Sequence, residues 1–170
     1  MAIITSTSFK GTTTEALAAT AAEIKASTKV TITDNTYTAA NLIAILAKTN
    51  NLPVVLEKTA ASIPFNGAAA DILTAIAGVN KYTGAITLTG TPSAAHLNDI
   101  AKGTTGKVTA ALAPGEAIDA ATVTALKDVK TSDAITFAPT QTTVSGNSEL
   151  TALINLKKLL PNADFTGIDT

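Results

Sequence analysis

Short runs of alternating hydrophobic and polar residues recur along the chain, and an alanine-rich segment follows most of them. Within residues 29–33, Val30 and Ile32 alternate with threonines, and this period of two predicts a β-strand. The alanine-rich segments instead repeat hydrophobic residues at the spacing of an amphipathic helix. Strand-like runs begin near Ile3, Val30, Val54, Ile86, Val108 and Ile135. The sequence therefore predicts about six strand–helix repeats at a spacing of roughly 25–30 residues.

The predicted helices begin with two recurring patterns. In the first, a residue with a side-chain oxygen precedes two alanines, which is typical of an N-cap. This pattern begins at Thr38, Ser93 and Asp119. The second pattern, hydrophobic-x-Gly, is also expected to lead into a helix, and it occupies residues 9–11, 65–67 and 144–146. Thr12 and Glu15 have the spacing of a capping box.

Strands joined to parallel neighbours through short helices need right-handed crossovers. Two architectures satisfy this requirement. A doubly wound α/β domain would bury both faces of its sheet, and its strands would then be hydrophobic throughout. Here one face carries threonine in most strands. The pattern therefore favours a single domain over residues 1–170, a right-handed β/α solenoid with a parallel sheet and helices mainly on one side; the doubly wound fold is the alternative.

The outward-facing threonines form a candidate binding surface. They are Thr31, Thr33, Thr87, Thr89 and Thr136. We expect these side chains to be exposed, with Val55 and Ala110 interrupting the array. Such a face suits a carbohydrate or protein partner, and it favours glycans over ice, which would need a more regular plane.

Composition narrows the classes of partner. All 12 basic residues are lysines, and the formal net charge is −1. Nucleic-acid binders usually carry a basic surface rich in arginine, so we expect no nucleic acid as partner. The chain has no cysteine, which excludes disulfides and thiolate metal sites. It also contains no apolar stretch long enough to span a membrane and no recognisable signal peptide.

Candidate catalytic chemistry is sparse. His96 is the single histidine, so a Ser-His-Asp triad or a histidine metal site is hard to build. The carboxylates are scattered and lack the spacing of a calcium loop, and no glycine-rich loop has phosphate-binding spacing. The six aromatic residues are interpreted as isolated packing or turn anchors. We therefore expect a protein that is not an enzyme and has no cofactor.

Residues 93–110 carry a threonine- and alanine-rich pattern that resembles repeats of very large bacterial proteins. These are cell-surface proteins of cyanobacterial type, S-layer-like proteins and RTX-like secreted proteins. A weaker similarity extends from about Ile4 to Phe165. The resemblance implies an extracellular or cell-surface structural role, as a spacer, adhesin or filament. The glycine-rich calcium repeat of RTX proteins is missing from this sequence, so the resemblance does not imply calcium binding through that motif.

Both ends of the predicted solenoid are hydrophobic rather than polar. Ile3 and Ile4 lie at one end, and Phe165 and Ile168 lie in a segment that is typical of one more short strand. We expect these residues to form end-to-end contacts with other copies or with neighbouring repeats of a longer chain. The last predicted helix carries the hydrophobic stripe Leu150, Leu153 and Ile154, which is expected to face the core.

Overall fold

The computed structural model of this chain describes residues 3–5, 8–49, 52–58, 65–80 and 82–170. The predicted α/β class is confirmed, because parallel strands and helices alternate along most of the chain. The strands are β1 (Ile3–Thr5), β2 (Ser8–Gly11), β3 (Val30–Ile32), β4 (Val54–Leu56), β5 (Phe65–Ala68), β6 (Ile86–Thr89), β7 (Val108–Ala111) and β8 (Ala134–Thr136). The helices are α1 (Thr13–Ala18), α2 (Ala21–Lys25), α3 (Ala39–Leu46), α4 (Ala69–Ala77), α5 (Ala94–Gly103), α6 (Ala120–Ala125) and α7 (Gly146–Leu159).

The strands form two sheets where the sequence predicted one continuous sheet. Their orders are β1-β2-β3-β4 and β5-β6-β7-β8. In the first sheet Phe9, Val30 and Val54 are in register, and in the second Phe65, Ile86 and Val108 are. The sheets divide after β4, because the segment following α4 lies beside it in place of β5. There Val54 bridges Val79, and its amide donates to the carbonyl oxygen of Gly78.

The first strand also departs from the prediction. β1, which contains Ile3 and Ile4, runs antiparallel to β2, whereas the sequence suggested the first strand of a parallel series. Only two residues separate β1 from β2, and a parallel connection needs about a dozen. The parallel series therefore starts at β2, and β1 forms the N-terminal edge of the first sheet.

Two of the three hydrophobic-x-Gly patterns belong to strands, not to helix starts. Residues 9–11 lie in β2 and residues 65–67 in β5. In both places the chain passes from the strand into the next helix within about two residues. The same pattern therefore lies in a strand and directly precedes a helix. The third pattern, residues 144–146, does lead into a helix, α7, where Gly146 has a positive φ of 79°.

The predicted helix caps are confirmed. The side chains of Thr38, Ser93 and Asp119 each accept a hydrogen bond from the amide three residues later. Thr12 and Glu15 form the expected capping box of α1. These caps depend on residues within one turn, so short-range sequence is enough to specify them.

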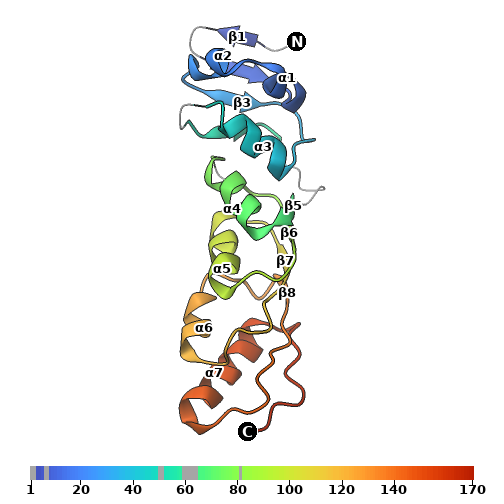
Figure 1. Ribbon diagram of the computed structural model, residues 1–170, viewed down its shortest axis with the longest axis vertical. Coiled ribbons are helices and arrows are strands. Elements are labelled where there is room, and N and C mark those ends of the chain that lie inside the picture. Colours follow the sequence, from blue (N-terminus) through green and yellow to red (C-terminus); the bar gives the residue numbers. More distant parts are fainter. Residues whose placement is uncertain (1–2, 6–7, 50–51, 59–64, 81) are drawn as a thin grey trace.

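The elements follow one another along the long axis of the molecule, from the N-terminus to the C-terminus (Figure 1). Helices α4 to α7 line one side of this stack, and strands β5 to β8 line the other (Figure 1). Consecutive helices from α3 to α7 pack against each other. One cluster of buried, mainly aliphatic residues runs from Phe9 to Phe165 and so joins both sheets.

Five of the six aromatic side chains pack together in two groups, so the interpretation as isolated anchors is wrong for them. Phe65 stacks on Tyr82 with ring centroids 4.8 Å apart and meets Tyr37 edge to face at 5.8 Å. Residues 37, 65 and 82 come from segments on both sides of the division between the sheets. This aromatic group therefore packs the core where the sheets separate.

Side chains from one part of the stack form hydrogen bonds with the helix ends of the part that precedes it. Asp34, which follows β3, accepts hydrogen bonds from the Thr13 amide and hydroxyl at the start of α1. Glu116, which follows β7, likewise accepts from the Ala94 amide at the start of α5. Acidic groups suit these positions, because helix N-termini carry unpaired amides and partial positive charge.

Two lysines donate hydrogen bonds at the C-terminal ends of the same two helices. The Lys48 ammonium donates to the Ala19 carbonyl after α1 at 2.8 Å, and the Lys130 ammonium donates to the Thr104 carbonyl after α5 at 2.9 Å. We call each acid together with its lysine a clamp: Asp34 and Lys48 on α1, and Glu116 and Lys130 on α5. The two clamps use the same chemistry at equivalent places in the two sheets.

Candidate functional site

The threonines predicted on the first sheet do not form an exposed surface. Thr31 is only 6% exposed, so its prediction as a surface residue is wrong. It lies in register between Lys10 and Val55, and the ion pair of Lys10 with Glu57 spans the same face of β3. These neighbours cover the Thr31 side chain. Thr33 lies just beyond β3 and is half-buried.

The second sheet does present threonines on its outer face. Thr89 and Thr136 are exposed, and Thr87 is partly exposed. Thr87 pairs with Thr109, which is also exposed. Sequence reasoning missed Thr109 and placed Ala110 on this face, but Ala110 is buried. The alternation of side chains along the strand predicts this result: Val108 points to the core, so residue 109 must point outward.

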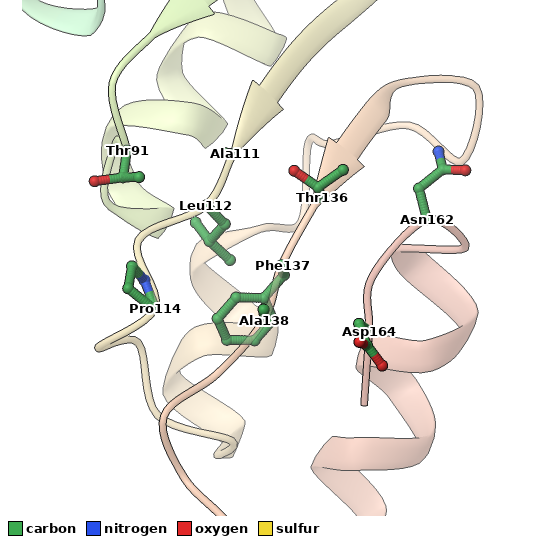
Figure 2. A pocket seen from close by; sticks show the side chains of 9 residues that line it. All are labelled: Thr91, Ala111, Leu112, Pro114, Thr136, Phe137, Ala138, Asn162 and Asp164. Atoms are coloured by element: carbon green, nitrogen blue, oxygen red, sulfur yellow. The ribbon is translucent and has the colours of Figure 1, made fainter. Parts of the chain in front are cut away.

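A pocket of about 380 Å³ opens at the carboxyl ends of β7 and β8. Figure 2 shows that its side chains come from the loop after β6, from both strands and the residues following them, and from the segment after α7. It is lined by Thr91, Ala111, Leu112, Pro114, Thr136, Phe137, Ala138, Asn162 and Asp164. Thr136 is the one predicted site residue in this pocket; the other lining residues were not identified from the sequence.

Asp164 is the charged group among the pocket residues. One of its carboxylate oxygens accepts hydrogen bonds from the Thr166 hydroxyl at 2.7 Å and the Thr166 amide at 2.9 Å. These bonds favour the ionised form, so they hold the pKa of Asp164 below its usual value. The pocket therefore combines an apolar floor with a carboxylate, an amide and two hydroxyls.

The predicted terminal contacts are placed differently from expectation. Ile3 and Ile4 lie in β1 at the sheet edge. Phe165, by contrast, is only 9% exposed and packs edge to face on Phe137 at 5.8 Å, so it is a core residue and not an open end. Ile168 is partly buried against the same core. The aromatic partner explains the difference, because Phe137 offers Phe165 a site within its own chain.

The last helix exposes hydrophobic residues that were predicted to be buried. Leu153 faces the core as expected, but Leu150 is 41% exposed and Ile154 is 60% exposed. Among the described side chains, these are the large hydrophobic ones left exposed. They lie one turn apart on α7, on the side away from Thr151 and Asn155, which line a pocket between α6 and α7. The expectation that the stripe faces the core is therefore confirmed for Leu153 and wrong for Leu150 and Ile154, because no helix of the described residues packs on that side of α7.

Side chains that could hold a metal ion are not gathered in the described parts of the chain. His96 is exposed on α5. The residues that the structure describes contain no cluster of three or more histidine, cysteine, aspartate or glutamate side chains suited to a metal ion. Across the same residues, every helix is too short or too polar to cross a membrane.

Comparisons with known proteins leave the chain without a family. No family model matches the sequence, and no significant similarity to a curated protein or to a solved structure is found. The pocket and the exposed face of α7 are therefore interpreted from their own geometry.

Proposed function

We propose that this chain is a non-enzymatic structural module of a bacterial surface layer, adhesin or extracellular filament, built as a β/α solenoid. The observation that carries the proposal is the repeated clamp on α1 and α5. In both places an acid and a lysine from later in the stack form hydrogen bonds with the two ends of an earlier helix. Such neighbour-to-neighbour closure is typical of repeat proteins, in which each repeat is stabilised mainly by the next.

The C-terminal end supports assembly with further copies. Residues 164–169 continue the parallel arrangement: the Asp164 amide donates to the Phe137 carbonyl at 2.8 Å, and Asp169 bridges Thr143. This segment adds to the stack of strands, but the described chain places no helix after it beside α7. Leu150 and Ile154 therefore lie where a further helix would pack.

A second copy of the chain can supply that helix. At the opposite end of the long axis lies α2 (Figure 1), which packs against β2. Its surface exposes Ala21, Ala22 and Ala26, which leave room for larger side chains, together with the acidic Glu23. Exposed Lys157 and Lys158 at the end of α7 complement Glu23 in the first turn of α2, away from Lys25 in its last turn. Contacts between opposite ends of an elongated molecule are heterologous, so they extend into filaments instead of closing into dimers.

The expected affinity of one such contact is low. Burying the exposed parts of Leu150 and Ile154 contributes about 2 kcal/mol in total, whereas association costs at least about 4 kcal/mol in lost translational and rotational freedom. Backbone pairing at the sheet edges adds to the attraction. Assembly is therefore expected at high local concentration, as on a crowded cell surface, and not in dilute solution.

Sedimentation velocity over a concentration series tests this proposal. We expect the average mass of the wild-type protein to rise with concentration and negative-stain electron microscopy to show linear chains. The double variant Leu150→Glu/Ile154→Glu should remain monomeric, because it places two charges in the contact. A glutamate at position 154 also pairs favourably with Lys158 one turn later, which preserves the helix.

The matched control places the same charges on another helix. Ala70 and Thr74 are exposed one turn apart on α4, so Ala70→Glu/Thr74→Glu should assemble like the wild type. A wild-type protein that stays monomeric up to about 1 mM, or a loss of assembly in both double variants alike, would contradict end-to-end assembly through α7.

A further inference from the structure

The pocket at the carboxyl ends of β7 and β8 is held open by backbone bonds and not by mobile side chains. Its walls are successive strands bonded to each other: the Leu112 amide donates to the Thr136 carbonyl, and the Asp164 amide donates to the Phe137 carbonyl, both at 2.8 Å. On the other wall, the Ala113 amide donates to the Pro92 carbonyl at 3.0 Å. Because these backbone groups are already paired, a ligand would meet a preformed cavity and would interact with side chains.

The side chains offer two kinds of surface. The exposed Ala111, Pro114 and Ala138 form an apolar floor, with Leu112 and Phe137 buried. Figure 2 shows Asn162 and Asp164 across the pocket from Pro114 and Thr91. Asp164 uses one carboxylate oxygen for Thr166, which leaves the second oxygen to accept from a ligand. The Asn162 amide both donates and accepts. The Thr136 hydroxyl donates to the Ala110 carbonyl at 3.4 Å, so it can accept from a ligand.

This combination selects against several ligand classes. The pocket residues include no lysine, so a phosphate or carboxylate would face Asp164 without a compensating positive charge. A bare metal ion would find one carboxylate where calcium sites use several oxygen ligands. A purely apolar ligand would leave the second carboxylate oxygen of Asp164 and the Asn162 amide without a partner in the ligand. A neutral molecule with an apolar face and several hydroxyl groups fits both surfaces.

We propose that this pocket binds one pyranose ring of a neutral carbohydrate. The ring presents its C–H face to the apolar floor, while its hydroxyls donate to Asp164 and Thr136 and exchange hydrogen bonds with Asn162. The volume of about 380 Å³ lies near the lower end of the range for small-molecule sites, which suits one or two sugar rings. The inference moves carbohydrate recognition from the flat threonine face to a pocket at its edge, and it does not depend on end-to-end assembly.

Nuclear magnetic resonance titration of the isotope-labelled protein tests this inference. The probes are the methyl glycosides of glucose, galactose, mannose and N-acetylglucosamine. For at least one glycoside we expect shifts confined to amides around the pocket, among them Thr136, Asn162 and Asp164, with a dissociation constant on the order of 1 mM. Asp164→Ala should weaken binding at least about tenfold, and the isosteric Thr136→Val by about three- to tenfold.

The control keeps the same substitution but moves it out of the pocket. Thr89→Val, on the outer face of β6, should bind like the wild type, and the assembly variant Leu150→Glu/Ile154→Glu should as well. The proposal is overturned if no glycoside shifts the pocket amides at about 50 mM. It is also overturned if n-butylammonium binds there and glycosides do not, or if Thr89→Val weakens binding as much as Thr136→Val, which would place recognition on the sheet face.

Discussion

A Cβ atom at Gly106 would lie 2.1 Å from the carbonyl oxygen of Gly84. The two backbones are held at this distance by Thr104, whose hydroxyl donates to the Gly84 carbonyl and accepts from the Gly106 amide, both at 2.9 Å. No side chain fits between them. This close approach joins the segments that lead into β6 and β7, so it fixes the spacing of the second sheet at one end.

Substituting Gly106 by alanine is expected to destabilise the fold. The new methyl group would meet backbone atoms, which cannot rotate away, so we expect Gly106→Ala to lower the free energy of unfolding by about 2–3 kcal/mol. Urea denaturation measures this change. Gly115→Ala is the matched control, because nothing lies within 4 Å of a Cβ built there; its effect should stay within about 1 kcal/mol. Equal losses in both variants would refute the steric explanation.

Asp133 replaces a backbone carbonyl in the same sheet. It is only 2% exposed, and its two carboxylate oxygens accept from the amides of Val108 and Lys130, both at 2.9 Å. In Asp133→Asn the amide nitrogen must face one of these N–H donors. We therefore expect the free energy of unfolding to fall by about 1–3 kcal/mol. The exposed Asp99→Asn should leave the urea midpoint nearly unchanged, and a midpoint for Asp133→Asn that matches this control would contradict the prediction.

Features encoded within a few residues could be predicted from the sequence. The caps at Thr38, Ser93 and Asp119 needed only the next three residues. The period of two placed Thr87 and Thr89 on the outer face correctly. The second sheet is the part of the fold where these local rules and the structure agree best.

Features that depend on distant neighbours could not be predicted. The burial of Thr31 arises from Lys10 and Val55, which come from other strands. Leu150 is exposed because no described helix packs on that side of α7, although its spacing matches a core stripe. The pocket likewise needs Asp164 to return beside Phe137. The sequence predicted one more short strand in this segment, but it did not specify which residues that strand would lie beside.

Tyr82 is expected to make the fold sensitive to alkaline pH. Burial of its ring raises the pKa of Tyr82 to about 12, and Tyr37 nearby adds to the effect. Between about pH 10 and 12 the unfolded chain loses the phenolic proton while the folded chain keeps it, so stability falls as the pH rises. We expect a loss of about 1–2 kcal/mol across this range, because water screens part of the full effect.

The variant Tyr82→Phe isolates this contribution. It keeps the ring that stacks on Phe65 and removes a long hydrogen bond of 3.4 Å to the Ala85 carbonyl. Groups unchanged by the substitution cancel in the comparison, so the difference in unfolding free energy between variant and wild type reports Tyr82 together with its interaction with Tyr37. That difference should move in favour of the variant as the pH rises above 10. A constant difference from pH 7 to 12 would show that Tyr82 ionises normally.

The two lysines of the clamps should act on separate parts of the stack. Lys48→Met and Lys130→Met keep most of the aliphatic stem but leave the carbonyls after α1 and α5 without their donor, so each should lower the local stability by about 1–2 kcal/mol. Hydrogen exchange measures this helix by helix. We expect Lys130→Met to speed exchange in α5 and not in α1, and Lys48→Met to do the reverse, because repeats are stabilised by their immediate neighbours. The exposed Lys102→Met serves as the control. If either clamp variant sped exchange equally in both helices, the stack would open as one cooperative unit, and the neighbour-by-neighbour stabilisation that supports a solenoid would be excluded.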